Sequence, residues 1–179
     1  MFALLPTASL AQLLLEAADR PLWAVDLPRQ RMLCCDRNTT PEIMPISSSA
    51  TGIGNRPESR CTPLGWHAIT DIIGTNAPLG QPFVSRKPAG PPLTDWLHGE
   101  GDAILTRVLV LQGLQPVLNG NSHARYIYLH GTHQEALLGT PASCGCIRMR
   151  NRDIARLADA CQQIPPSHWP HVWIGACRD

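Results

Sequence analysis

The pattern of apolar and polar residues predicts short strands joined by loops. Two apolar runs, 22–27 and 32–36, flank Pro28-Arg29-Gln30, which indicates two strands connected by a turn. Further β-rich runs follow at 43–47, 66–72, 104–111, 125–129 and 172–174. Many short strands and turns predict a mainly β protein, a β-rich α+β fold, and not a helical bundle.

Residues 1–20 have the spacing of an amphipathic helix. Ser9 is a candidate N-cap, and the apolar side chains that share one face after it are Leu10, Leu13, Leu14 and Ala17. The segment contains Glu16 and lacks the basic start of a signal peptide. We therefore expect a helix packed on a single domain formed by residues 21–179, and no signal peptide.

A second helix is expected near the end of the chain. Asn151 is its candidate N-cap, and Ile154 and Leu157 lie on one face of a helix running from 152 to about 162. A pair of prolines then follows, which ends the helix.

Residues 74–102 fit neither the strand pattern nor the helix pattern of apolar residues. Five prolines and five glycines interrupt this segment, and Trp96 and Leu97 are its main apolar anchors. A long irregular connection inside a compact domain is usually functional. We expect a lid over the active site, with Trp96 fixing the lid to the core.

Composition and charge exclude several classes of protein. A chain of 179 residues is long enough to bury one substantial core. Its 15 basic and 14 acidic side chains give a formal charge of +1, so nucleic acid is not an expected partner. No apolar run approaches the roughly 20 residues that span a bilayer. The sequence indicates no cofactor and does not fix the oligomeric state, for which we expect a monomer.

The cysteines leave two alternatives open. There are seven of them, at positions 34, 35, 61, 144, 146, 161 and 177. Three disulfides would leave one thiol, which suits a nucleophile in an oxidising compartment. Alternatively, most are free and buried as small apolar residues.

His130 and Cys146 are a candidate base and nucleophile. His130 follows the predicted strand 125–129, so we expect it at a strand end facing a cleft, with Cys146 across a loop. A neighbouring imidazole can lower a cysteine pKa from about 8.5 to roughly 3.5–7.5, which produces the reactive thiolate. The carbonyl of Gly131 can accept the ring N–H and orient it.

The residues around Cys146 suit acyl transfer. Gly145 permits a tight turn that aims the backbone amides of Cys144, Gly145 and Cys146 at one point, as an oxyanion hole requires. If this segment is extended, the side chains of Arg148 and Cys146 point to the same face. The guanidinium fork of Arg148 can then hold a substrate carboxylate.

The order of these residues resembles the L,D-transpeptidase catalytic domain family (YkuD-like). The family pattern is met by His130-Gly131-Thr132, then Ser143, Gly145-Cys146-Ile147-Arg148-Met149 and Asn151-x-Asp153. Weaker likeness at 46–54 and 62–65 extends the similarity over residues 22–174. One departure is Cys144, where the family usually has histidine. This change removes an imidazole beside the expected oxyanion site.

The resemblance implies a fold, a reaction and a location. The fold would be a β-sandwich of mixed sheets with a short N-terminal helix and one helix after the catalytic cysteine. Cys146 would attack a peptidoglycan stem peptide after a meso-diaminopimelate or L-alanine residue, and the amine of a second stem peptide would resolve the thioester into a cross-link. Ser143, Thr132 and Tyr128 would bind substrate together with Arg148. The expected location is the periplasm or cell envelope.

Three alternatives stay open. Water in place of the second amine would give a stem-peptide carboxypeptidase or endopeptidase. His130-x-x-His133 and Cys144-x-Cys146 supply four ligands suited to zinc, although a single residue between the cysteines is shorter than the usual spacing. A non-catalytic cell-wall-binding module would keep the histidine and cysteine idle.

Overall fold

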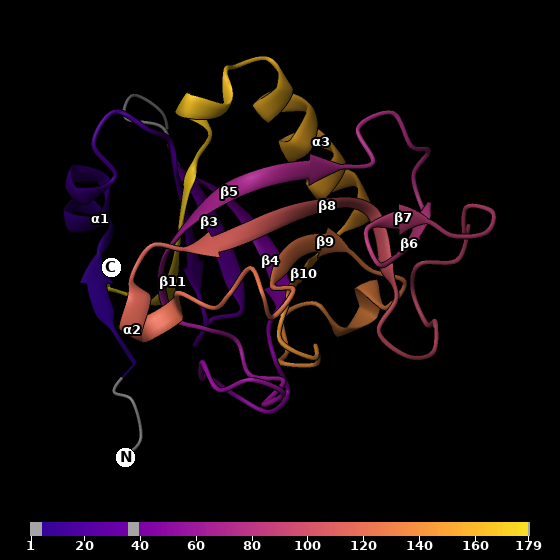
Figure 1. The fold of residues 1–179 in the computed structure, drawn as a ribbon, viewed down its shortest axis with the longest axis horizontal. Coiled ribbons are helices and arrows are strands. Elements are labelled where there is room, and N and C mark those ends of the chain that lie inside the picture. Colours follow the sequence, from indigo (N-terminus) through magenta and orange to yellow (C-terminus); the bar gives the residue numbers. More distant parts are fainter. Residues whose placement is uncertain (1–4, 36–39, 179) are drawn as a thin grey trace.

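The computed structural model describes residues 5–35 and 40–178 and shows a mainly β protein with few helices, as predicted. Eight strands form a closed barrel (Figure 1). In chain order they are β2 (Leu22–Asp26), β3 (Arg31–Cys35), β4 (Glu42–Ser47), β5 (Gly65–Ile73), β8 (Ile104–Gly113), β9 (Tyr128–Gly131), β10 (Ile147–Met149) and β11 (His171–Arg178). Around the barrel they follow the order β11, β2, β3, β4, β10, β9, β8 and β5.

The barrel closes because β5 has a partner on each side. It lies antiparallel to β11 through its first residues and antiparallel to β8 along most of its length. Strand pairing therefore continues around the whole ring, and the predicted sandwich of separate sheets is corrected to one closed barrel. The prediction of mixed pairing is confirmed, since β9 with β10 and β2 with β11 are parallel pairs among antiparallel ones.

The predicted hairpin of β2 and β3 is confirmed. Leu22 pairs with Cys35 at the open end of the hairpin. The side chain of Gln30 donates to the Leu27 carbonyl at 2.7 Å and closes the turn. The predicted end of the second strand at Asp36 lies outside the described residues.

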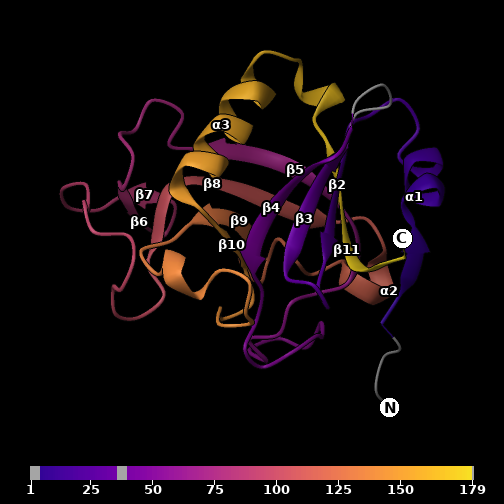
Figure 2. The same ribbon diagram turned by 180° about the vertical axis from the view of Figure 1, so that it is seen from behind.

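The barrel interior and α3 share the main apolar core. α3 (Asn151–Gln162) is the predicted second helix and packs against β8 and β9 (Figure 2). The buried side chains that join its apolar face to the inward-facing strand residues include Ile154, Leu157, Leu109, Leu129, Ile147 and Met149. Because side chains alternate along strands, Val108, Val110 and Tyr128 face the other way and form a separate cluster. This second cluster lies on the outer face of the barrel.

The N-terminal helix is shorter than predicted. α1 (Leu10–Glu16) follows a short strand, β1 (Thr7–Ser9), which pairs in parallel with β11. The predicted cap is confirmed, since Ser9 Oγ accepts a backbone N–H of the first turn at 3.2 Å. Leu13 is fully buried in a cluster with barrel residues. Positions 1–4 of the predicted helix lie outside the described residues.

The segment 74–102 is only partly irregular. It contains a hairpin of β6 (Pro82–Val84) and β7 (Lys87–Pro88), and β6 pairs with β8. The rest of the segment projects from one side of the barrel (Figure 1). The indole of Trp96 donates within the segment, whereas its backbone carbonyl accepts the Glu135 N–H at 2.7 Å. The backbone of Trp96, more than its ring, therefore ties the segment to the rest of the protein.

Three short helical elements were not predicted. They are α2 (Pro116–Asn119), η1 (Glu135–Leu137) and η2 (Pro166–His168). α2 lies between the predicted strands 104–111 and 125–129. In the part of the chain that the structure describes, none of the helices has the length and apolar character needed to cross a membrane.

Candidate active site

Two adjacent parallel strands, β9 and β10, carry the candidate pair, His130 within β9 and Cys146 just before β10. Their register places His130 opposite Arg148, and Cys146 lies one position before β10. Because side chains alternate in strands, Cys146 and Arg148 share the outer face of the barrel with Tyr128 and His130. Cys146 packs against the cluster that contains Tyr128.

His130 lies one residue before the end of β9, close to the predicted strand end, but it is buried and does not face an open cleft. β9 begins at Tyr128, and His130 is only 1% exposed. Its Nδ1 lies 2.8 Å from the Gly131 carbonyl. Since a carbonyl only accepts, Nδ1 carries the proton and Nε2 keeps a lone pair that can act as a base. Burial lowers the pKa of His130, opposed by the charge of Asp102, so the ring is neutral near pH 7.

Cys146 is a half-buried thiol. Its Sγ donates to the Tyr126 carbonyl at 3.3 Å. Burial raises the pKa of Cys146 to about 12, although the backbone N–H of Tyr128 lowers it. The expectation of a thiolate held by His130 is therefore corrected. Burial outweighs the opposing effects, and both thiol and imidazole are uncharged at rest.

Arg148 is already occupied by protein groups. It is 2% exposed, its Nε lies 2.7 Å from Asp102 Oδ1, and its Nη1 donates to Gln134 Oε1 at 2.8 Å. The expectation that its fork holds a substrate carboxylate is corrected, because Asp102 and Gln134 take that place.

Asp102 is a site residue that sequence reasoning missed. It comes from the last position of the segment 74–102, which places the end of the expected lid against the site. Burial raises the pKa of its carboxyl group, but the hydrogen bond from Arg148 and the charges of His130 and Arg148 hold the pKa below its ordinary value. The carboxylate is therefore ionised, and no local motif marked it in the sequence.

The amides expected to form an oxyanion hole are engaged elsewhere. Gly145 makes the predicted tight turn with a φ of 123°. The Cys144 N–H donates to Asp102 Oδ2 at 2.9 Å, and the Gly145 N–H donates to Ser143 Oγ at 3.1 Å. The expectation that the amides of Cys144, Gly145 and Cys146 all point at one oxyanion is corrected, because side-chain acceptors hold the first two.

Two residues expected to bind substrate are buried supports instead. Thr132 has no exposed surface, and its Oγ1 accepts the Gln134 N–H at 3.1 Å. Ser143 is 2% exposed and donates to the Cys146 carbonyl at 2.6 Å. Tyr128, the third such residue, does line a cavity.

Asn151 supports the site from the start of α3. It was predicted as the N-cap, but it is the first helical residue and Arg150 occupies the cap position. Its Nδ2 donates to the Thr132 carbonyl at 2.6 Å and to Glu135 Oε1 at 2.8 Å, while its Oδ1 accepts from the Thr106 hydroxyl. This side chain therefore links β8, the residue after β9, and η1.

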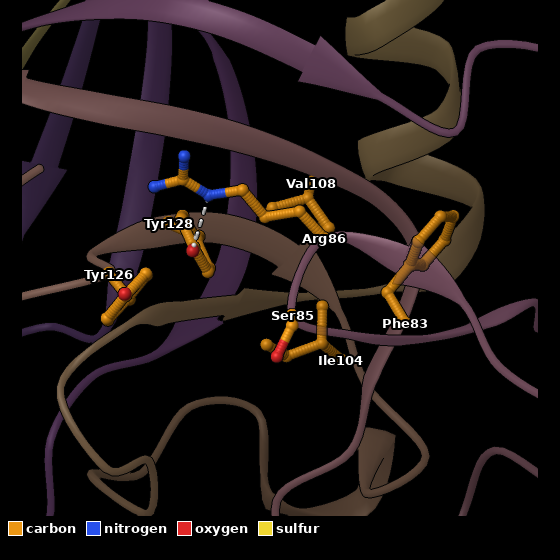
Figure 3. A pocket seen from close by; sticks show the side chains of 7 residues that line it. All are labelled: Phe83, Ser85, Arg86, Ile104, Val108, Tyr126 and Tyr128. Atoms are coloured by element: carbon orange, nitrogen blue, oxygen red, sulfur yellow. Dashed lines mark hydrogen bonds between the residues drawn. The ribbon is translucent and has the colours of Figure 1, made fainter.

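Two cavities flank Tyr126. The first has a volume of about 430 Å³ and is lined by Phe83, Ser85, Arg86, Ile104, Val108, Tyr126 and Tyr128 (Figure 3). The second has a volume of about 410 Å³ and is lined by Pro57, Glu58, Arg60, Ala124, Arg125, Tyr126, Ile127 and Cys144. Tyr126 has a positive φ of 58°, which residues other than glycine rarely adopt. Its backbone carbonyl accepts the Cys146 S–H. Sequence reasoning missed Tyr126 and Arg86 as site residues because neither belongs to a motif.

Within the described part of the chain, the cysteines form no disulfides and do not gather with histidines into a metal site. All seven cysteines, each of them described, are free thiols, as the second alternative expects, but only Cys35, Cys161 and Cys177 are buried. Within residues 5–35 and 40–178, no three histidine, cysteine or acidic side chains gather in a way that could hold a metal ion. His133 Nε2 instead lies 2.6 Å from the Glu100 carbonyl. The zinc alternative thus has no assembled site in these residues.

Several solved structures share this fold. An L,D-transpeptidase from Xylanimonas cellulosilytica has a TM-score of 0.54 at 17% identity, covering 97% of this chain and 64% of that chain. A Bdellovibrio bacteriovorus structure has a TM-score of 0.51 at 17% identity, with coverages of 92% and 50%. A mutant Enterococcus faecium L,D-transpeptidase has a TM-score of 0.50 at 12% identity, with coverages of 87% and 49%. This chain therefore spans less than two thirds of those chains, and at such identities the likeness concerns the fold alone.

The sequence itself also matches a family. No curated protein matches the chain. Residues 21–166, however, match the L,D-transpeptidase catalytic domain (YkuD). The matched region contains β2 to β10 and α3, and with them both His130 and Cys146. The chain therefore belongs to the L,D-transpeptidase catalytic domain family.

Proposed function

We propose that this chain is a cysteine-dependent L,D-transpeptidase that cross-links peptidoglycan stem peptides through a thioester on Cys146, with a meso-diaminopimelate or L-alanine residue as acyl donor. Family membership supports peptidoglycan as the substrate class. The observation that carries the proposal is the pairing of β9 with β10, which puts Cys146 and the His130 ring, fixed on the Gly131 carbonyl, on one face. Such a substrate would place the protein in the periplasm or cell envelope.

Because both groups are neutral at rest, proton transfer accompanies attack. The Cys146 S–H gives its proton to His130 Nε2 while Sγ bonds to the carbonyl carbon of the donor stem peptide. The leaving amine takes that proton, and the thioester remains on Cys146. The amine of a second stem peptide then attacks the thioester and passes a proton through His130 to the departing sulfur, which restores the thiol.

Asp102 controls which amides can stabilise the oxyanion. In the described arrangement its carboxylate accepts the Cys144 N–H. A substrate that displaces Asp102 would free this donor for the developing negative charge. Loss of one such donor typically costs about 3 kcal/mol of transition-state stabilisation, so the position of Asp102 would affect the rate strongly.

The test is to incubate the protein with purified muropeptides and analyse the products by mass. We expect cross-linked dimers from the unmodified chain and none from Cys146→Ala, with a rate at least about a hundredfold lower for His130→Ala. Cys144→Ala is the matched control, because this exposed side chain lies two residues from the nucleophile and only its backbone N–H is proposed to act. It should keep dimer formation.

Two other outcomes would count against transfer. Trimmed monomers in place of dimers would mean that water resolves the thioester, so that the chain is a carboxypeptidase or endopeptidase. No change in any muropeptide would contradict the enzymatic proposal and favour a non-catalytic wall-binding role.

A further inference from the structure

Arg86 brings a positive charge to the first cavity, whose wall residues Phe83, Val108 and Tyr128 belong to the cluster that Cys146 packs against. Its guanidinium carbon lies 5.4 Å from the centre of the Tyr126 ring and 5.5 Å from that of Tyr128. Its Nε donates to the Tyr128 hydroxyl at 2.9 Å. Figure 3 shows the guanidinium beside the two tyrosines, with its terminal nitrogens directed away from this hydrogen bond. The two rings therefore set the position of the charge and leave the outer side of the fork open.

The turn that carries Arg86 holds it in an unfavourable backbone conformation. Ser85 and Arg86 are the two residues between Val84 and Lys87, which pair across the hairpin, and their φ values are 49° and 65°. Two positive φ values are typical of a turn that favours asparagine and glycine. Contacts of the arginine side chain with the tyrosines offset this strain, and backbone preference does not explain an arginine here.

In the described part of the chain, Arg86 is the arginine that lines the first cavity, and its terminal nitrogens are free to bind a ligand. Arg148 is paired with Asp102 and Gln134. For Arg86, among the described residues, Nε has the Tyr128 hydroxyl as partner and the terminal nitrogens have no hydrogen-bond partner. No acidic side chain lines this cavity, whose other walls are mostly apolar. An apolar cavity with one open guanidinium suits a short chain that ends in a carboxylate.

We propose that Arg86 is the carboxylate-binding, specificity-determining residue of this site and receives a free carboxylate of the stem peptide in the cavity next to Cys146. This inference rests on the proposed function for the identity of the peptide. It assigns to Arg86 the role that the sequence had suggested for Arg148. The planar fork can pair with both carboxylate oxygens, which a lysine ammonium cannot do in the same geometry.

The test compares two thiol reagents that differ only in charge. Chloroacetylglycine and its neutral amide, chloroacetylglycinamide, alkylate a cysteine in the same way: the S–C bond forms, chloride leaves and the thiol proton passes to buffer. Peptide mapping with fragment-ion mass spectra, which distinguish Cys146 from Cys144, gives the rate at Cys146 alone. We expect Arg86→Asn, which suits the positive φ, to slow the anionic reagent about tenfold at Cys146. The neutral reagent should change by less than about twofold.

Two further variants make the result specific. Arg86→Lys should restore part of the preference for the anion, because it keeps the charge without the fork. Arg60→Asn is the matched control, since Arg60 also has a positive φ, of 56°, and lines the second cavity. It should leave the preference unchanged. Equal slowing of both reagents in Arg86→Asn, or loss of the preference in Arg60→Asn instead, would overturn the assignment.

The reagents separate this inference from the proposed function. Alkylation needs only the Cys146 thiol and the cavity, so the anion preference is measurable even if the protein forms no cross-links. Conversely, cross-linking that persists in Arg86→Asn with no change in the anion preference would leave the transpeptidase proposal intact and reject the role of Arg86.

Discussion

Cys146 presents its S–H to the Tyr126 carbonyl, and its reactivity should follow from this arrangement. Because burial raises the pKa of Cys146 to about 12, its thiolate is a small fraction at neutral and mildly alkaline pH. Each pH unit then increases that fraction about tenfold. We expect the rate of Cys146 alkylation by iodoacetamide, followed by peptide mass mapping, to rise about tenfold per unit between about pH 7 and 9.

The other cysteines need a control in that measurement. Cys144 is exposed and should also be labelled, so Cys146→Ala defines the labelling that does not come from the nucleophile. A rate at Cys146 that reaches a plateau below about pH 8 would show a preformed thiolate and contradict the neutral pair.

Single residues differ in how well the sequence revealed them. His130, Gly131 and Cys146 stand in a local order that suggests a base, the acceptor that orients it and a nucleophile, so the sequence was enough to select them as candidates. Asp102 comes from the proline- and glycine-rich segment and meets its partners, Arg148 and the Cys144 amide, across elements far apart in the chain. Such a long-range contact leaves no pattern in the local sequence.

At the scale of elements, Asn151 holds α3 to the barrel through buried hydrogen bonds. Asn151→Ala would leave the Thr132 carbonyl and the Thr106 hydroxyl without these partners. We expect a loss of about 3 kcal/mol in the free energy of unfolding, measured with urea. Arg152→Ala is the control at the next position, where the side chain is exposed, and should change stability by less than about 0.5 kcal/mol. Equal effects of the two substitutions would refute the role of Asn151.

Regular elements were predictable where the local pattern decides them. The strands around Pro28-Arg29-Gln30 and the helix after Asn151 follow their hydrophobic periodicity. The N-terminal helix was predicted too long because residues 7–9 pair with β11, a partner at the far end of the chain. β9 was predicted to begin too early, because Tyr126 adopts a positive φ that a strand cannot continue.

At the scale of the whole molecule, His67 should make stability depend on pH. Its ring is buried on β5, with Nδ1 3.0 Å from the Gly65 carbonyl and Nε2 3.0 Å from Ser122 Oγ. Burial lowers the pKa of His67 to about 4. In the unfolded chain a histidine has a pKa of about 6.5. Between about pH 6.5 and 4 the unfolded chain therefore binds more protons than the folded protein, so stability falls as the pH drops through this window.

The expected loss between about pH 7 and 4.5 is up to about 3 kcal/mol from His67, measured as urea midpoints at the two values. In His67→Gln the difference between the two midpoints should shrink, even if the variant is less stable at both. His130 also has a lowered pKa, so part of the pH dependence should remain. An unchanged difference in the variant would rule out His67 as the source.

Closure of the barrel was beyond the reach of the sequence. Periodicity indicates that β5 and β11 exist, but their pairing joins strands separated by most of the chain. A sandwich and a closed barrel use the same alternation of buried and outward residues, so the pattern does not distinguish them.

The closed ring also limits how the proposed stem-peptide substrate would bind. Each barrel strand has neighbours on both sides, and the strands that end the described sheet, β1 and β7, have three and two residues. β7 includes Pro88, which has no N–H to offer to an added strand. The described sheet thus offers little free edge to which a stem peptide could add as an extra strand. Such strand addition is a common way to bind peptides with little regard to their sequence. Under the proposed function, discrimination between stem peptides would come from side chains around the cavities, so a few substitutions there would change the preferred substrate without altering the fold.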